Sequence, residues 1–184
     1  MQIRRVIIIH GWGDDPTCGW MAWLVGQLES RGIEAVAPAM PSPRRPDFEE
    51  WLRVIAEVVG EIDEQTALIG HSLGCFMLLR FLERYKGEGR LGKLILIAGF
   101  VLPADPEHHA RFEPTPDFVR ISARAKQIFC VYSDDDHVVV PSRSKALHDK
   151  LGGQLVLDAG KRHFAGLRGI SELPNILNIV LDNS

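Results

Sequence analysis

The sequence predicts an α/β fold, a three-layer sandwich in which helices cover both faces of a mainly parallel, six-stranded sheet. Short apolar runs of strand length alternate with segments of helical period along the whole chain. Four of these runs are dense in Ile, Val and Leu, as strands covered by helices on both sides must be. The length of 184 residues suits a single domain, which we expect to span residues 1–184.

The elements follow one another in a regular order. Strands are predicted at residues 5–9, 33–37, 67–69, 94–98, 127–132 and 154–157. Helices are predicted between or after them, at residues 20–30, 48–62, 72–85, 142–151 and 173–181. The second helix has the clearest pattern, because its apolar residues recur three and four apart and form one stripe. Asp47 precedes this helix and is a suitable N-cap.

The first strand contains four consecutive apolar residues, 6–9, after a basic start. A signal peptide needs about 7–15 apolar residues and a membrane helix about 20, so this run indicates a buried strand. The three cysteines, Cys18, Cys75 and Cys130, are an odd number without paired spacing, which is typical of reduced thiols. Both observations predict a cytoplasmic protein.

Residues 100–118 interrupt the alternation of strands and helices. This segment contains Pro103, Pro106, Pro114 and Pro116, and interior prolines exclude a long regular helix. It is either a surface connection or a small cap that borders a pocket and sets the preference for acyl chain length.

The charge balance excludes two classes of partner. Lys and Arg number 21 and Asp and Glu number 24, which gives a formal net charge of −3. A chain with this balance has no electrostatic footprint for nucleic acid or for an anionic membrane surface. We therefore expect a small-molecule substrate, whereas a protein partner cannot be predicted from the sequence.

The most informative motif is Gly70-His71-Ser72-Leu73-Gly74, which lies between a predicted strand and a predicted helix. A serine hydroxyl becomes an effective nucleophile when a sharp turn exposes it and a base can reach it. The glycines allow the strand and the helix to approach each other around that turn. The motif predicts Ser72 as a nucleophile.

A base and an acid follow at the carboxyl ends of later strands, where parallel sheets place catalytic groups. His163 follows the sixth strand, and we expect it, rather than His10, His71 or His137, to be the general base. Its loop can carry an imidazole across to a serine that follows the third strand.

The acid is expected in the run Ser133-Asp134-Asp135-Asp136, which follows the fifth strand. Asp136 is preferred over Asp135 and then Asp134, because the apolar residues 138–140 should bury the end of this turn. All three carboxylates remain candidates at this stage.

The turn after the first strand, His10-Gly11-Trp12-Gly13, supplies the remaining part of such a site. The backbone N–H groups of Trp12 and Leu73 are expected to form an oxyanion hole. Trp12, Met40 and Phe100 are candidates for substrate binding, as parts of an apolar wall.

These motifs resemble the α/β-hydrolase superfamily, and within it the small serine hydrolases that include retinoblastoma-binding protein 9. The resemblance covers nearly the whole chain, and its most specific part is Met40-Pro41-Ser42-Pro43 followed by Glu50-Trp51. It implies a minimal sheet of strand order 2-1-3-4-5-6 and a Ser-Asp-His triad that needs no cofactor or metal. It also places the acid at Asp136. Family members have a proline four residues after the acid, where this chain has Val140 and then Pro141.

The predicted function is a serine hydrolase of small carboxylic esters, with thioesters and amides left open. The main alternative is a non-catalytic scaffold on the same fold. A metal site built from His108, His109, residues 134–136 and His137 is disfavoured, because no pair has the helical spacing of a zinc motif. A nucleotide site at residues 10–15 is also disfavoured, because carboxylates would face the phosphates.

Overall fold

The described residues of the computed structural model are 2–101, 112, 114–165 and 169–182. They contain one six-stranded sheet in which every neighbouring pair of strands is parallel. The strand order is β2-β1-β3-β4-β5-β6, as expected. The strands are β1 (Arg5–Ile9), β2 (Glu34–Val36), β3 (Thr66–His71), β4 (Leu91–Ile97), β5 (Ala125–Tyr132) and β6 (Gln154–Leu157).

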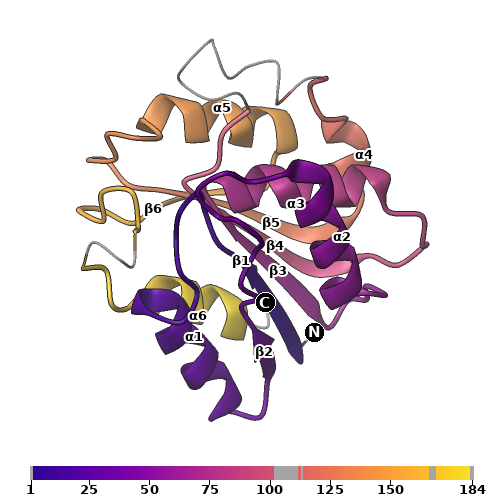
Figure 1. Cartoon of the computed structure of the whole chain (residues 1–184), viewed down its shortest axis with the longest axis horizontal. Helices are drawn as coiled ribbons and strands as arrows, with labels where there is room; N and C mark the ends of the chain where they lie inside the picture. The colour runs from indigo at the N-terminus through magenta and orange to yellow at the C-terminus, as the bar shows by residue number, and fades with distance from the viewer. Residues whose placement is uncertain (1, 102–111, 113, 166–168, 183–184) are drawn as a thin grey trace.

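Helices cover both faces of this sheet, which confirms the predicted three-layer arrangement (Figure 1). The helices α1 (Gly19–Glu29) and α6 (Pro174–Leu181) contact each other on one face. On the other face lie α2 (Phe48–Val59), α3 (Leu73–Arg84), α4 (Phe118–Ser122) and α5 (Pro141–Leu151), each against the next. None of the helices in the described part of the chain is long and apolar enough to cross a membrane.

The core lies along the two central strands and the helix that follows the first of them. Every residue of β3 and β4 is buried, because these strands have a neighbour on each side and helices above and below. Ten residues of α3 are buried as well, so this helix is fixed on the sheet along most of its length. The junction between β3 and α3 is therefore among the most constrained points of the fold.

The structure differs from the expected elements in a few places. The short helix α4 was not predicted, because five residues are too few for a periodic pattern. Helix α2 ends at Val59 and not at residue 62, since Gly60 adopts a φ of 57° and turns the chain out of the helix. Of the predicted cap at 100–118, residues 102–111 and 113 lie outside the described residues.

Candidate active site

Ser72 occupies the sharp turn between β3 and α3. Its backbone has a φ of 51°, and its N–H donates to the carbonyl oxygen of Ile97 on β4 at 2.9 Å. A Cβ at Gly70 would lie 2.7 Å from the backbone nitrogen of Cys75, and one at Gly74 would lie 2.1 Å from the carbonyl oxygen of Ile9. Both glycines are therefore required by close backbone approach, and they hold the start of α3 against the ends of β3 and β1.

A continuous chain of hydrogen bonds joins Ser72 to two side chains from other loops. His163 Nε2 lies 3.0 Å from Ser72 Oγ, and His163 Nδ1 lies 2.9 Å from Asp136 Oδ2. Ser72 and Asp136 are only 8% and 4% exposed. Three residues that lie far apart in sequence thus meet at the carboxyl edge of the sheet, after β3, β5 and β6.

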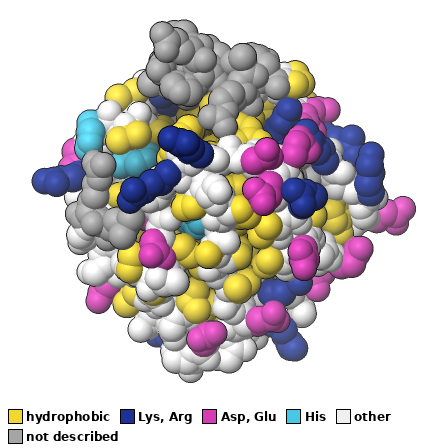
Figure 2. Space-filling view, viewed as in Figure 1, with side chains coloured by type: hydrophobic (Ala, Val, Ile, Leu, Met, Phe, Trp, Pro, Cys, Tyr) yellow, Lys and Arg dark blue, Asp and Glu magenta, His cyan; other side chains and the backbone are white. Residues whose placement is uncertain are grey.

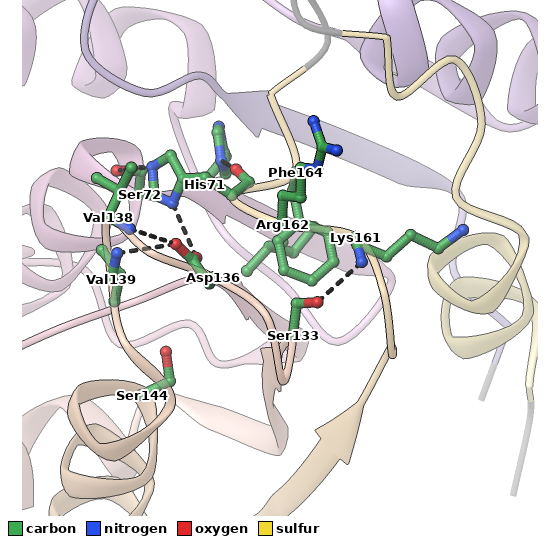
Figure 3. A network of polar contacts seen from close by, with 12 residues as sticks. His71, Ser72, Ser133, Asp136, Val138, Val139, Ser144, Lys161, Arg162 and Phe164 are labelled. Atoms are coloured by element: carbon green, nitrogen blue, oxygen red, sulfur yellow. Dashed lines mark hydrogen bonds and ion pairs between the residues drawn. The ribbon is translucent and has the colours of Figure 1, made fainter.

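Asp136 is held in place by the backbone that follows it. Its Oδ1 accepts hydrogen bonds from the N–H groups of Val138 and Val139, at 2.8 and 2.9 Å (Figure 3). The carboxylate therefore has bonded partners on both oxygens, and Oδ2 is directed at the imidazole of His163.

The neighbouring carboxylates fix the loop that carries His163. Asp134 Oδ1 accepts from the N–H of Gly160 at 2.9 Å, and Asp135 Oδ1 accepts from the N–H of Arg162 at 2.7 Å. Ser133 Oγ accepts from the N–H of Lys161 at 2.8 Å, whereas the side chain of Lys161 extends away from Asp136 (Figure 3). These roles of Ser133, Asp134 and Asp135 could not be predicted from the sequence, because they depend on the spacing of two loops.

Burial lowers the pKa of His163 below its ordinary value. Desolvation is the largest cause, and the electrostatic effect of the neighbouring imidazoles of His71 and His137 acts in the same direction. The hydrogen bond and the charge of Asp136 oppose this shift without cancelling it. The imidazole is therefore neutral near pH 7 and able to accept a proton.

The residues expected to supply the oxyanion donors, Leu73 and Trp12, lie in segments that adjoin Ser72. Leu73 is the first residue of α3, where backbone N–H groups have no partner within the helix. The loop of Trp12 is supported by residues 43–44, because Gly13 N–H donates to the carbonyl oxygen of Pro43 and Trp12 Nε1 donates to that of Arg44. A Cβ on Gly11 would lie 3.1 Å from Ser72 Cβ, so this loop packs closely against the serine.

His10 and Cys75 are close to the site but have structural partners. His10 accepts a hydrogen bond from the N–H of Met40 on Nε2 at 3.0 Å, and burial lowers its pKa. Trp51 Nε1 donates to the carbonyl oxygen of Pro41, which explains why this Trp accompanies the Met-Pro-x-Pro segment. The Cys75 thiol donates to the carbonyl oxygen of Gly70, and burial raises its pKa well above the ordinary value.

A pocket of about 740 Å³ opens over Ser72 and His163. Trp12, one of the three candidates for substrate binding, is exposed and lines this pocket. Met40 and Phe100, the other two candidates for substrate binding, are buried and are not among the residues of its wall. The described residues of the wall are Gly11, Trp12, Gly13, Asp14, Arg44, His71, Ser72, His137, Val138, Gly160, Lys161, Arg162, His163, Ala165, Gly169 and Ile170.

Phe100 belongs instead to an aromatic cluster that includes Phe76 of α3. Its ring lies 5.6 Å from that of Phe112, which in turn lies 4.6 Å from Phe76 and 5.3 Å from Phe48. The sequence alone does not show whether an aromatic residue near the end of a strand faces a pocket or the core.

Three cationic residues, Arg44, Lys161 and Arg162, belong to the wall of the pocket. Figure 2 shows histidine and cationic side chains next to one another on one face of the molecule. Within the described part of the chain, no three His, Cys, Asp or Glu side chains converge as metal ligands would. His108 and His109 lie outside the described residues.

Comparisons with known proteins assign the chain to a family. Residues 6–182 match the serine hydrolase family. The chain is 32% identical to YdeN of Bacillus subtilis (strain 168) over 179 residues, which cover 96% of this chain and 94% of YdeN. It is 27% identical to the serine hydrolase RBBP9 of Rattus norvegicus over 159 residues, which cover 84% and 83% of the two chains.

Solved structures show the same fold. The crystal structure of the B. subtilis ydeN gene product superposes with a TM-score of 0.89, over 96% of each chain. Est1E of Butyrivibrio proteoclasticus, solved with ferulic acid bound, superposes with a TM-score of 0.73 at 16% identity, over 97% of this chain and 87% of Est1E. The chain therefore has the α/β-hydrolase fold, and it belongs to the serine hydrolase family as a hydrolase.

Proposed function

We propose that the protein hydrolyses small carboxylic esters through an acyl-enzyme formed on Ser72. The observation that carries this proposal is the hydrogen-bond chain from Ser72 Oγ through the imidazole of His163 to Asp136 Oδ2. A buried carboxylate, a neutral imidazole and a serine at a sharp turn together provide what nucleophilic acyl transfer requires.

In the proposed mechanism, Ser72 Oγ attacks the ester carbonyl while His163 Nε2 accepts the hydroxyl proton. Asp136 holds the tautomer of His163 that has Nδ1 protonated, and it stabilises the imidazolium that forms. The N–H groups of Trp12 and Leu73 stabilise the oxyanion. His163 then donates its proton to the leaving alcohol, and a water molecule activated by His163 hydrolyses the acyl-enzyme.

The size and the wall of the pocket support a small substrate. Its volume of about 740 Å³ is within the range of small-molecule sites. Trp12, Val138 and Ile170 contribute apolar surface to the pocket that contains Ser72, and we assign the acyl group to contact with these residues. Because Est1E shares the fold and its structure contains ferulic acid, aromatic esters belong in the substrate panel beside aliphatic ones.

The proposal is tested with p-nitrophenyl esters of increasing chain length and with a fluorophosphonate probe. We expect Ser72→Ala to lose both turnover and labelling, and His163→Gln to lower kcat by several orders of magnitude. Ser122→Ala, on the short helix α4 and outside the pocket wall, is the matched control and should keep wild-type rates.

Two results would contradict the proposal. An inhibitor adduct on a residue other than Ser72 would assign the chemistry elsewhere. A folded wild-type protein that neither reacts with the probe nor hydrolyses any ester in the panel would favour the scaffold alternative.

A further inference from the structure

A second carboxylate–imidazole contact involves His71, the residue before Ser72. Asp14 Oδ2 is 3.4 Å from His71 Nδ1, and the two side chains are only 6% and 3% exposed. Among the described residues, neither of these two atoms has a hydrogen-bond partner. The proposed triad uses neither side chain, although both lie in the wall of the pocket.

The partners of His71 determine where its protons are. Nε2 lies 2.8 Å from the carbonyl oxygen of His163, and because a carbonyl only accepts, Nε2 must carry a hydrogen. A neutral His71 would then present the lone pair of Nδ1 to the carboxylate of Asp14. A buried arrangement of two acceptors is unfavourable, so Nδ1 must also carry a hydrogen when Asp14 is ionised.

Asp14 is in a suitable environment to be ionised. Burial alone raises the pKa of its carboxyl, but the contact with His71 and the N–H of Asp15 oppose this effect, and the pKa lies below its usual value. Asp14 Oδ1 accepts the Asp15 N–H at 3.1 Å, which leaves Oδ2 directed at the imidazole.

His71 connects the loop of Asp14 with the loop of His163. Its ring centroid lies 5.1 Å from that of His163, and the indole of Trp20 packs edge-on against it. Trp20 Nε1 also donates to the carbonyl oxygen of Phe164 at 2.7 Å, so both residues hold the backbone around His163.

We propose that Asp14 and His71 form a buried carboxylate–imidazolium pair that positions His163 through its carbonyl oxygen and keeps a positive charge beside its imidazole. This inference rests on the proposed function, since it assigns His163 the role of base. Asp14 and His71 are positioning residues in this scheme, because neither needs to touch the substrate.

The pair has a consequence for the pH dependence of hydrolysis. The ionisable groups that act on the His163 imidazole are Asp136, His71 and His137, while His71 itself faces Asp14 and His10. A positive charge on His71 disfavours a second one on His163 and so lowers the pKa of His163. The base is then protonated only at more acidic pH, and the acid limb of kcat/KM should have its midpoint below pH 6.5.

Asp14→Asn tests this arrangement directly. The new amide can donate to His71 Nδ1, so His71 keeps its bond to the His163 carbonyl but holds only one proton. We expect the acid limb of kcat/KM to move to higher pH by about half to one unit, because a charge close to His163 is lost. Asp15→Asn, at the exposed residue that follows Asp14 in the same loop, is the matched control and should leave the midpoint in place.

A second measurement does not depend on turnover. Nitrogen-15 NMR of histidine-labelled protein, with signals assigned from His71→Gln and His163→Gln, reports the protonation of each ring. We expect both nitrogens of His71 to be protonated at neutral pH in the wild type, and one nitrogen in Asp14→Asn. The midpoint of the His163 titration should rise in Asp14→Asn as the acid limb does.

The outcomes separate this inference from the proposed function. A neutral His71 in the wild type, or an Asp14→Asn protein whose activity falls equally at all pH values without a shift, would overturn the pair. A wild type that hydrolyses no ester would contradict the proposed function, whereas the NMR titration would still test the pair.

Discussion

Three consecutive carboxylates after β5 have different environments although they share one sequence run. Asp134 and Asp135 are exposed and accept backbone N–H groups of the loop that carries His163. Asp136 is buried and contacts the His163 imidazole itself. The hydrogen bond from Ser133 is the largest of the causes that lower the pKa of Asp135, which suits an anchoring carboxylate.

This division predicts unequal effects of three Asn substitutions on ester hydrolysis. Asp136→Asn should lower kcat about 10⁴-fold, because the wrong tautomer of His163 is then favoured. Asp135→Asn removes a charged acceptor for the His163 loop and should lower kcat roughly tenfold or less. Asp134→Asn should lower kcat by a smaller factor. Steady-state kinetics beside thermal unfolding would measure both effects. A larger loss at Asp134 or Asp135 than at Asp136 would be inconsistent with the proposed acid.

Sequence order was sufficient to predict a serine, an acid and a histidine after β3, β5 and β6. The choice among the three carboxylates depends on how the chain turns after Asp136, since Val138 and Val139 direct their N–H groups back at it. The contact between Asp14 and His71 could not be predicted, because their loops come together only when β1 and β3 pair in the sheet.

At the scale of elements, apolar runs predicted most of the sheet. The bounds of β1 and β6 agree with prediction, and β5 begins two residues earlier than expected. The start of β4 was missed because Gly92 and Lys93 interrupt the apolar run. Lys93 is nevertheless buried, and its ammonium group donates to the carbonyl oxygens of Ile179 and Asp182 at the end of α6. The pattern of apolar residues does not show that a strand includes a polar residue whose hydrogen-bond partners lie on a distant helix.

Gly74→Ala should affect both stability and catalysis, since its Cβ would overlap the carbonyl oxygen of Ile9 and displace the start of α3. We expect a loss of about 1–3 kcal/mol in the free energy of unfolding. We also expect a fall in kcat of about 10²-fold, as the Leu73 N–H moves. Denaturant unfolding and ester kinetics would measure the two effects.

Gly26→Ala is the matched control for this substitution. Gly26 lies inside α1 with no atom near the position of a Cβ, so alanine should raise the stability by about 0.5–1 kcal/mol. An equal response of the two glycines to alanine would show that close approach at Gly74 is not the constraint.

At the scale of the whole molecule, the candidate site is built from contacts between distant parts of the chain. The bond between His163 and Ser72 spans 91 residues, and that between Trp20 and Phe164 spans 144. Loops of the site are held by other loops, since Ser133, after β5, accepts a hydrogen bond from the N–H of Lys161, after β6. The geometry therefore exists only in the folded sheet, which is why sequence spacing could name the residues but not their distances.

Three residues at the site have positive backbone φ angles, which are unfavourable for residues other than glycine. Ser72 has a φ of 51°, and Arg162 and Phe164, on either side of His163, have φ values of 50° and 54°. Each such conformation costs about 1–3 kcal/mol in a residue other than glycine. The surrounding sheet and helices must supply the free energy that keeps these residues in place.

Ser72→Gly should therefore raise the free energy of unfolding by about 1 kcal/mol while it abolishes hydrolysis. Ser72→Ala loses the hydroxyl but keeps the unfavourable φ, so its stability should stay near that of the wild type. Thermal and denaturant unfolding of the two variants would separate the two effects, and equal stabilities would contradict the argument.

A trade-off between stability and activity follows from the conformation of Ser72. A library selected for expression or heat resistance alone would enrich glycine at position 72 and so discard the reactive hydroxyl. Any effort to improve this protein by directed evolution should therefore include hydrolysis in every round of selection.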